Sequence, residues 1–280
     1  MELRFFSDTQ CYQIMKSIKL KIGLPLLVAG LFTLFQGNAQ TRVTLDNYYN
    51  QETNPHTGKP FHYLWSDQEN SGFSQWGDIF RAKGALTDTL RQAPTPGNLK
   101  GSDIYLIVDP DTRAESPDPH YIERPAIRTI DQWVKQGGVL VLMANDSGNS
   151  EFNHFNQLAE TFGLHFNEVS IYHVTGHHYD MGAITALPDY PPFKGVSKIY
   201  MKETSTLHVV KPAYPVLVKN GQVILAESRY GKGLVIAVCD PWIYNEYIGH
   251  KYLPGDFQNH QAAEQFTAYL LERSGKARGR

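Results

Sequence analysis

Between residues 104 and 163 the chain alternates short apolar runs with stretches in which apolar positions recur at helical spacing. Residues 104–108 and 139–144 are apolar throughout, which is typical of strands covered on both faces. Apolar residues three or four apart predict amphipathic helices over 122–134 and 152–162. This alternation predicts an α/β fold with a flavodoxin-like, doubly wound, mostly parallel sheet and helices on both faces.

The flanking sequence extends the same pattern in both directions. The further elements that we predict are strands at 43–49, 85–90, 222–228 and 234–239 and helices at 73–80 and 262–270. The last two strands are close enough to form a hairpin. Residues 169–218 contain short strand-like runs broken by prolines and glycines, so we expect a β-rich extension in the C-terminal half rather than a second domain.

The first residues have the pattern of an export signal. Three lysines precede an apolar segment at 22–35, which is short for a membrane span, and small residues follow at 37–39. We expect a signal peptide over 1–39, with cleavage near Ala39 and Met15 as an alternative start. An anchor that is never cut is the alternative interpretation of this segment.

The remainder is then one domain over 40–274, with a basic tail at 275–280. We expect it in the periplasm or secreted, with no membrane span in the mature chain. Cys239 is the only cysteine in this part, so an internal disulfide is excluded and the fold depends on its core. Because Cys239 ends an apolar run, we expect a small buried residue rather than a reactive thiolate.

Composition narrows the function classes only slightly. The chain has 26 Lys and Arg against 28 Asp and Glu, a net charge of −2, which gives no basis for nucleic-acid binding. Hydrophobic residues make up 41% of the chain, an ordinary globular share that excludes a disordered protein.

Polar residues follow three of the predicted strands, and ligands of open α/β sheets bind beyond the carboxyl ends of the strands. The candidate acid and base groups for catalysis are Asp109, Asp111, Asp146 and Asp240. The alternative is that these residues cap helices and shape turns. Ser147 does not fit a nucleophile elbow, because position 145 is Asn rather than Gly.

Aromatic residues accompany amides and carboxylates in two loops, a combination that suits the apolar face and hydroxyl edge of a sugar ring. The candidate ligand-binding residues are His62, Trp65, Asn145, Asp146, Trp242, Tyr244, Glu246 and Tyr247. The alternative is that the aromatic rings pack beneath the loops. His178 and Asp180 are candidate metal ligands, but two are too few for a zinc or iron site, so we expect neither metal nor cofactor.

Several segments resemble the class I glutamine-amidotransferase-like superfamily, which implies a flavodoxin-like fold. These segments are 137–142, 160–166 and 230–238. Residues 62–65, 70–74, 107–112, 145–146 and 240–247 are similar to an uncharacterised amidotransferase-like domain of Bacteroidota, which occurs alone or fused to unsaturated rhamnogalacturonyl hydrolases. The elbow position, 145–148, holds no cysteine, so the resemblance does not imply glutaminase activity.

The resemblance implies an exported accessory protein for using plant cell-wall polysaccharides of the pectin or rhamnogalacturonan type. Such a protein would bind a carbohydrate or a partner enzyme without glutaminase chemistry. Two alternatives stay open: a hydrolase of unsaturated or acidic glycans that uses the strand-end carboxylates, and a docking module for a glycosidase.

Overall fold

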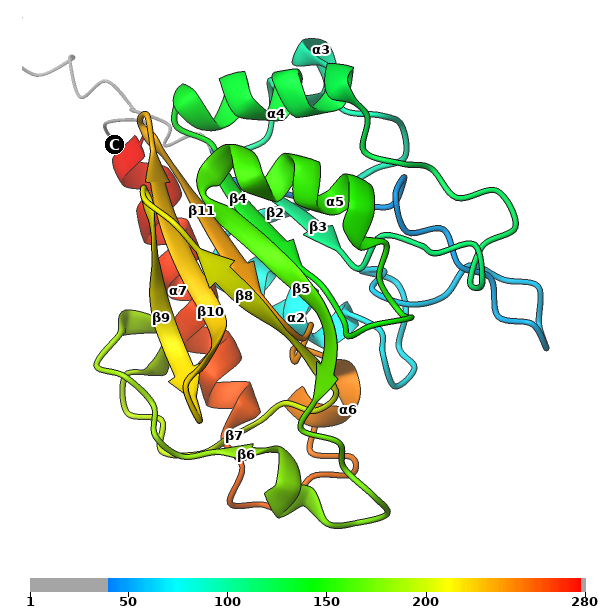
Figure 1. Cartoon of the computed structure of the whole chain (residues 1–280), viewed down its shortest axis with the longest axis vertical. Helices are drawn as coiled ribbons and strands as arrows, with labels where there is room; N and C mark the ends of the chain where they lie inside the picture. Colours follow the sequence, from blue (N-terminus) through cyan, green and yellow to red (C-terminus); the bar gives the residue numbers. More distant parts are fainter. Residues whose placement is uncertain (1–39, 278–280) are drawn as a thin grey trace, which may run out of the picture. The chain divides into compact units, whose positions relative to one another are not determined.

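A nine-stranded mixed sheet lies at the centre of the fold (Figure 1). The computed structural model describes residues 40–277, so the expected signal peptide at 1–39 lies outside the described residues. The strands follow the order β2-β1-β3-β4-β11-β10-β8-β5, and β9 pairs with β10 beside this path.

One half of the sheet is parallel. Its strands are β2 (Leu86–Leu90), β1 (Arg42–Asp46), β3 (Ile104–Val108), β4 (Val139–Met143) and β11 (Gly233–Val238). This is the flavodoxin-like strand order, which confirms the predicted fold class. Every residue of β3 and β4 is buried, because α4 (Arg124–Lys135) and α5 (Phe152–Ala159) lie on one face of the sheet and other helices cover the opposite face (Figure 1).

The other half is antiparallel and contains most of the predicted β-rich extension. Its strands are β5 (Leu164–Ile171), β8 (Thr204–Val209), β9 (Ala213–Lys219) and β10 (Gln222–Tyr230). The expected hairpin joins the two halves, since β10 is antiparallel to β11 whereas β11 is parallel to β4. Two short strands, β6 (Ala183–Ile184) and β7 (Ile199–Tyr200), pair separately.

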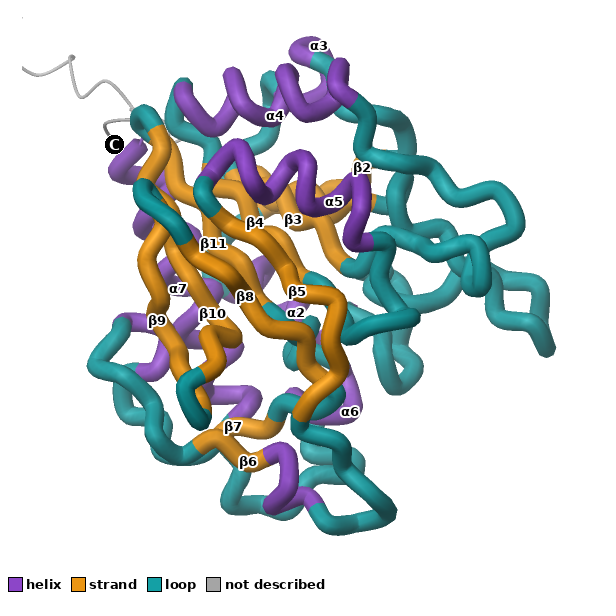
Figure 2. The backbone as a smooth tube through the Cα atoms, in the orientation of Figure 1, coloured by secondary structure: helices purple, strands orange, loops and turns teal. Residues whose placement is uncertain are grey.

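The remaining helices include the two predicted over 73–80 and 262–270, together with short ones that the sequence pattern did not predict (Figure 2). They are α2 (Ser74–Ala82), α3 (Pro96–Leu99), α6 (Asn245–Ile248), α7 (Asn259–Ala277) and the 3-10 turns η1 (Glu160–Phe162), η2 (Tyr179–Gly182) and η3 (Pro191–Phe193). Helices α2 and α7 lie on the side of the sheet opposite α4 and α5. Helix α7 continues to Ala277, into the segment 275–280 that was expected to be a tail.

Gly163, between η1 and β5, gives a direct test of close backbone packing. It has a φ of +80°, and a Cβ at this position would lie 2.3 Å from the Val210 carbonyl oxygen. Gly148 has a φ of +92° but no atom within 4 Å of the corresponding position. Gly163→Ala should therefore cost about 2 kcal/mol more unfolding free energy than Gly148→Ala, since both variants share the φ penalty and only one is overpacked. Urea unfolding measures the difference, and equal losses would contradict this packing.

Candidate functional site

A polar pocket of about 250 Å³ opens where three parallel strands end. Asp109 follows β3, Asn145 comes shortly after β4, and Asp240 comes shortly after β11; all three line the pocket. The loops add further lining residues, which are Glu52, His62, Tyr63, Ser71, Glu115, Asn149, Lys202, Glu203, Tyr244, Glu246 and Tyr247. The pocket therefore lies at the sheet edge where open α/β folds bind their ligands.

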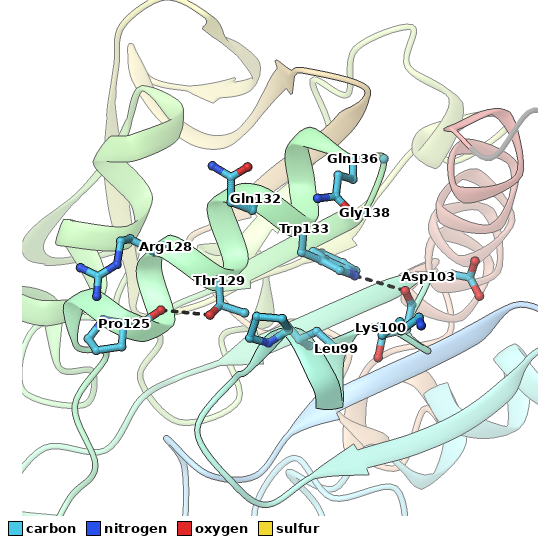
Figure 3. Close-up of a pocket in the computed structure, with 13 residues that line it drawn as sticks. Leu99, Lys100, Asp103, Pro125, Arg128, Thr129, Gln132, Trp133, Gln136 and Gly138 are labelled. Atoms are coloured by element: carbon cyan, nitrogen blue, oxygen red, sulfur yellow. Dashed lines mark hydrogen bonds between the residues drawn. The ribbon is translucent and has the colours of Figure 1, made fainter.

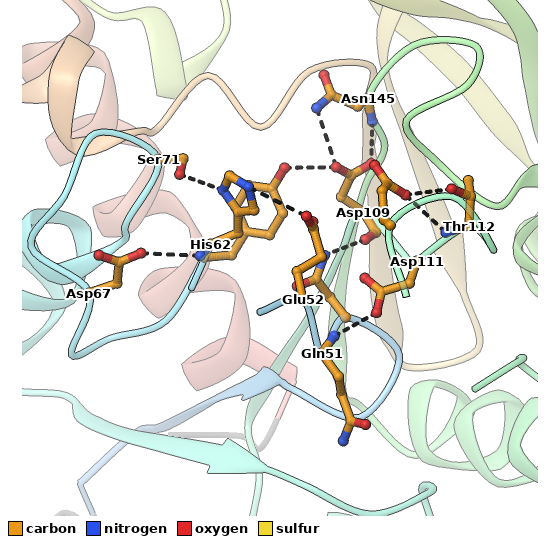
Figure 4. Close-up of polar contacts among 12 residues, drawn as sticks. Gln51, Glu52, His62, Asp67, Ser71, Asp109, Asp111, Thr112 and Asn145 are labelled. Atoms are coloured by element: carbon orange, nitrogen blue, oxygen red, sulfur yellow. Dashed lines mark hydrogen bonds and ion pairs between the residues drawn. The ribbon is translucent and has the colours of Figure 1, made fainter. Parts of the chain in front are cut away.

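Asp109 organises the floor of this pocket (Figure 4). Its Oδ1 accepts from the Asn145 backbone N–H at 3.0 Å and from the Ser150 hydroxyl, and its Oδ2 accepts from the Tyr63 hydroxyl at 2.7 Å and the Asn145 amide at 3.2 Å. An ionised carboxylate offers about four acceptor sites, so the protein itself uses all of them. Asp109 thus positions Tyr63 and Asn145 rather than offering a free oxygen to a ligand.

Burial raises the pKa of Asp109 to about 7, although the hydrogen bonds from Ser150, Tyr63 and Asn145 oppose this shift. The side chain is 2% exposed. The Asp109 carboxyl therefore changes its protonation near neutral pH in the folded protein. The free energy of unfolding should depend on pH in the same range.

The Asp240 carboxyl can accept more hydrogen bonds than the protein donates to it. It is 1% exposed, and its Oδ2 accepts from the Lys202 backbone N–H at 3.0 Å. Within residues 40–277, no hydrogen bond reaches its Oδ1. Burial raises the pKa of Asp240 well above its usual value; the Lys202 N–H and ammonium oppose this, while Asp109 and Glu203 add to it. A ligand donor in the pocket could therefore bond to this carboxyl.

Glu52 and His62 form a contact pair in the lining of the same pocket. His62 Nε2 lies 3.5 Å from Glu52 Oε2, and His62 Nδ1 is hydrogen-bonded to the Ser71 hydroxyl. Burial raises the pKa of Glu52 to about 8, with the charges of Glu115, Asp111 and Asp109 adding to the effect. Burial also lowers the pKa of His62 to about 4. At pH 7 the imidazole is therefore neutral and the glutamate is largely protonated, so the contact is not an ion pair.

Backbone strain is concentrated in the walls of this pocket. Seven non-glycine residues in the described part of the chain have a positive φ, and four of them line the pocket. These four are His62 at 67°, Tyr63 at 47°, Asp109 at 48° and Glu203 at 49°. Each such residue costs about 1–3 kcal/mol, and strain of this kind gathers where a protein fixes groups for binding or catalysis.

The structure brings together seven of the predicted site residues. The pocket is lined by Asp109, Asn145, Asp240, His62, Tyr244, Glu246 and Tyr247. Asp146 and Asp111 do not line it. Asp146 holds the Asn149 amide at 2.6 Å and the Ser170 hydroxyl, while Asp111 accepts from the Gln51 backbone N–H at 2.8 Å. Both carboxylates shape the surrounding loops, as the turn-forming alternative proposed.

The expected aromatic platform for stacking a sugar is wrong. Trp242 is 1% exposed and packs against Phe266 of α7, with ring centroids 6.4 Å apart. Trp65 lies against Trp76, and its indole N–H donates to the Asp88 carbonyl. The rings of Tyr244 and Tyr247 are more than nine-tenths buried. These aromatics pack beneath the loops because the core needs their apolar area, so a ligand would meet mainly polar groups.

Sequence reasoning missed Glu52, Tyr63 and Glu203. All three come from irregular loops, where no periodicity indicates which side chains face inward. Tyr63 carries the only retrospective signal, because it lies in the segment 62–65 on which the family resemblance rests.

The candidate metal ligands do not form a site. Asp180 pairs with Lys198 at 2.9 Å, and the same ammonium pairs with Asp256 at 2.8 Å. Across the described residues, no group of three or more His, Cys, Asp or Glu side chains could hold a metal ion.

No helix within residues 40–277 is long and apolar enough to cross a bilayer. Cys239 is completely buried, as expected, and burial raises the pKa of its thiol.

A larger cavity of about 710 Å³ lies at the opposite ends of β3 and β4, between α3 and α4 (Figure 3). Its wall includes Trp133, whose indole N–H donates to the Ser102 carbonyl at 3.3 Å. Its lining is mostly apolar, and Gly137 alone among the lining residues has a positive φ. We therefore place the candidate site in the smaller polar pocket.

No protein-family model matches the chain, and no curated protein matches it. Several solved structures match its fold. The mmIFT52 N-terminal domain matches 82% of this chain and 97% of its own, with a TM-score of 0.62 and 14% identity. The cytoplasmic protein STM1381 from Salmonella typhimurium LT2 matches 83% of this chain and 99% of its own, with a TM-score of 0.53 and 15% identity.

A β-galactosidase from Rahnella sp. R3 also matches 83% of this chain but only 31% of its own, with a TM-score of 0.51 and 15% identity. The shared architecture is thus a whole domain in some proteins and part of a longer chain in others. At these identities the likeness establishes a common α/β fold and leaves the chemistry to be argued from the pocket.

Proposed function

We propose that this protein is an exported accessory protein for plant cell-wall polysaccharide use, and that the strand-end pocket binds one sugar unit of a pectin- or rhamnogalacturonan-type glycan. The observation that supports this most is the free Asp240 oxygen in a polar pocket whose backbone is strained at four positions. Fixed acceptors of this kind suit a ligand rich in hydroxyl donors.

The chemistry of the lining fits hydrogen bonding rather than stacking. Carboxylates of Asp240, Glu203 and Glu246 can accept from sugar hydroxyls, and the Lys202 ammonium can donate to a ring or hydroxyl oxygen. The volume of about 250 Å³ is at the small end for ligand sites, so it suits one ring rather than a longer chain.

The amidotransferase-like resemblance belongs to this proposal. The scaffold would be that of the class I superfamily without its thiol, since 145–148 holds no cysteine and the buried Cys239 does not line the pocket. The fold match to part of a β-galactosidase is compatible with a domain that works beside carbohydrate-active enzymes. The docking module for a glycosidase is the variant of this proposal in which a protein surface, rather than the pocket, makes the contact.

A hydrolase is the second candidate, and one observation favours it. Glu52, with a pKa of about 8, and Asp240 line the same pocket, so a protonated acid and a second carboxyl are both present at neutral pH. If the protein is a hydrolase that uses these two groups, Glu52→Gln and Asp240→Asn should each abolish hydrolysis of the glycan. Unchanged hydrolysis in both variants would remove these residues from any mechanism.

Isothermal titration with galactose, rhamnose and rhamnogalacturonan fragments tests the binding proposal. Asp240→Asn should weaken binding about tenfold, because an amide N–H₂ would replace or displace the free acceptor. Asp78→Asn is the matched control, since Asp78 lies on the exposed face of α2 and pairs only with Arg81. Binding that is equal in Asp240→Asn, or absent for every sugar at millimolar concentration, would contradict the proposal.

A further inference from the structure

The larger cavity, between α3 and α4, is separate from the strand-end pocket. Its volume of about 710 Å³ is nearly three times that of the pocket and falls within the usual range of ligand sites. The five residues of β3 lie between the two, which corresponds to about 17 Å at the usual rise per strand residue. A ligand in this cavity would therefore not touch the strand-end carboxyl groups.

Trp133 gives this cavity an aromatic surface that is fixed in place (Figure 3). A Cβ at Gly138 would lie 2.4 Å from Cε3 and 2.5 Å from Cδ2 of the indole, so only glycine lets the backbone pack this closely against the ring. The indole N–H donates to the Ser102 carbonyl at 3.3 Å. The ring remains partly exposed and lines the cavity together with Leu99. Because the ring is already ordered, a ligand that packs on it loses little side-chain entropy.

The accessible charges of this cavity are positive. Lys100, which directly follows α3, and Arg128 of α4 line it, and both are exposed. None of the ion pairs among residues 40–277 includes either of them. The acidic residue of the lining, Asp103, is buried, and its Oδ2 accepts from the Arg42 backbone N–H at 2.8 Å. An anionic group in the cavity would therefore meet two cations without an acidic partner.

Helix α4 adds amide groups beside these charges. Arg128, Gln132 and Gln136 are four residues apart in turn, so they lie along one face of the helix, and all three line the cavity. Amides both donate and accept, which matches sugar hydroxyls, and a guanidinium group matches a carboxylate with two parallel donors. The cavity thus combines an aromatic surface, hydroxyl-binding amides and a carboxylate-binding cation.

We propose that this cavity is a second glycan site, which binds a carboxylated sugar ring such as galacturonate. The apolar face of the ring would pack on Trp133, and its hydroxyls would meet the amides of Gln132 and Gln136. Its carboxylate would pair with the Arg128 guanidinium or the Lys100 ammonium. The volume suits a short oligosaccharide of such rings. The choice of galacturonate rests on the pectin-type glycan of the proposed function, whereas the preference for an anionic ring rests on this cavity alone.

Titration calorimetry with trigalacturonate and the neutral galactotriose, at pH 7 and low salt, tests the charge preference. Trigalacturonate should have a dissociation constant at least tenfold below that of galactotriose, and rising salt should reduce the difference. Arg128→Gln should weaken trigalacturonate binding about tenfold and leave galactotriose binding nearly unchanged. Arg124→Gln is the matched control and should bind as the unmodified protein does, since Arg124 is exposed one turn earlier on α4 and does not line the cavity.

Two further variants separate this cavity from the strand-end pocket. Trp133→Ala should weaken trigalacturonate binding severalfold, and Trp133→Phe should keep most of it. Asp240→Asn should leave trigalacturonate binding unchanged. Equal affinities for the two trisaccharides, or equal losses in Arg128→Gln and Arg124→Gln, would overturn the second site.

Two other results separate this proposal from its alternatives. Tighter binding of AMP than of trigalacturonate would overturn the second site in favour of a nucleotide, which also pairs a flat ring with an anion. Galactose binding that depends on Asp240 would leave the proposed function standing in either case. Trigalacturonate binding that depends on Arg128, without any binding of galactose, would support the second site and contradict the proposed function.

Discussion

Replacing Glu227 with alanine should lower the free energy of unfolding by about 4 kcal/mol. Glu227 lies on β10 with no exposed surface, and its carboxylate accepts from three tyrosine hydroxyls. Tyr190 and Tyr269 donate to Oε2, each at 2.6 Å, and Tyr214 donates to Oε1. These tyrosines come from the loop before η3, from α7 and from β9, so one carboxylate connects three separate elements to the sheet.

The expected loss comes mainly from the hydroxyls that alanine leaves without an acceptor. A hydrogen bond to a charged group contributes about 1.5–3 kcal/mol, but Tyr214 is 38% exposed and water can replace its partner. Glu227→Gln keeps one carbonyl acceptor and the side-chain volume, so it should lose about half as much. Glu264→Ala, at an exposed position of α7, should change stability by less than about 0.5 kcal/mol. A loss below about 1 kcal/mol in Glu227→Ala would show that the three tyrosine hydrogen bonds to Glu227 do not stabilise the fold.

The protein should be more stable at pH 5 than at pH 8.5, by at least about 3 kcal/mol. Burial raises the pKa of Glu52 to about 8, that of Asp109 to about 7, and those of Asp46 and Asp111 to about 6, whereas these groups ionise near 4 in the unfolded chain. Between these values the folded state holds protons that the unfolded state has released, so stability falls as pH rises through this range. His62 opposes the trend, because its pKa is lowered and the unfolded chain binds its proton first as pH falls below about 6.5.

Asp109→Asn isolates the contribution of Asp109. Asparagine tolerates the positive φ at this position, and it does not titrate. The fall in unfolding free energy between pH 5 and pH 8.5 should therefore be about 2 kcal/mol smaller in the variant than in the unmodified protein. Urea unfolding at several pH values measures both curves. Parallel curves would mean that Asp109 does not carry the raised pKa.

The strands and helices were predictable where the sequence pattern is strong. The runs at 104–108 and 139–144 are apolar on every residue because helices cover both faces of the sheet. The same parallel arrangement explains why Asp109, Asn145 and Asp240, widely separated in sequence, converge at one edge. No comparable rule exists for Glu52 or Glu203, whose positions depend on loop conformation.

The aromatic residues failed as predictors for a different reason. Trp242 follows a strand end and neighbours polar residues, which in the sequence is indistinguishable from an exposed binding residue. Trp242 is buried because it packs against Phe266, which lies farther along the chain in α7. Long-range packing of this kind leaves no pattern in the local sequence. The aromatic residues therefore indicated which loops surround the pocket, but not which side chains a ligand can reach.

Diffraction from crystals soaked in galactose tests the central claim, that the pocket at the carboxyl ends of the parallel strands holds a sugar. The account predicts electron density for one ring between Asp240, Asn145 and Glu203. An empty strand-end pocket, with sugar density only in the cavity beside Trp133 or nowhere, would contradict it.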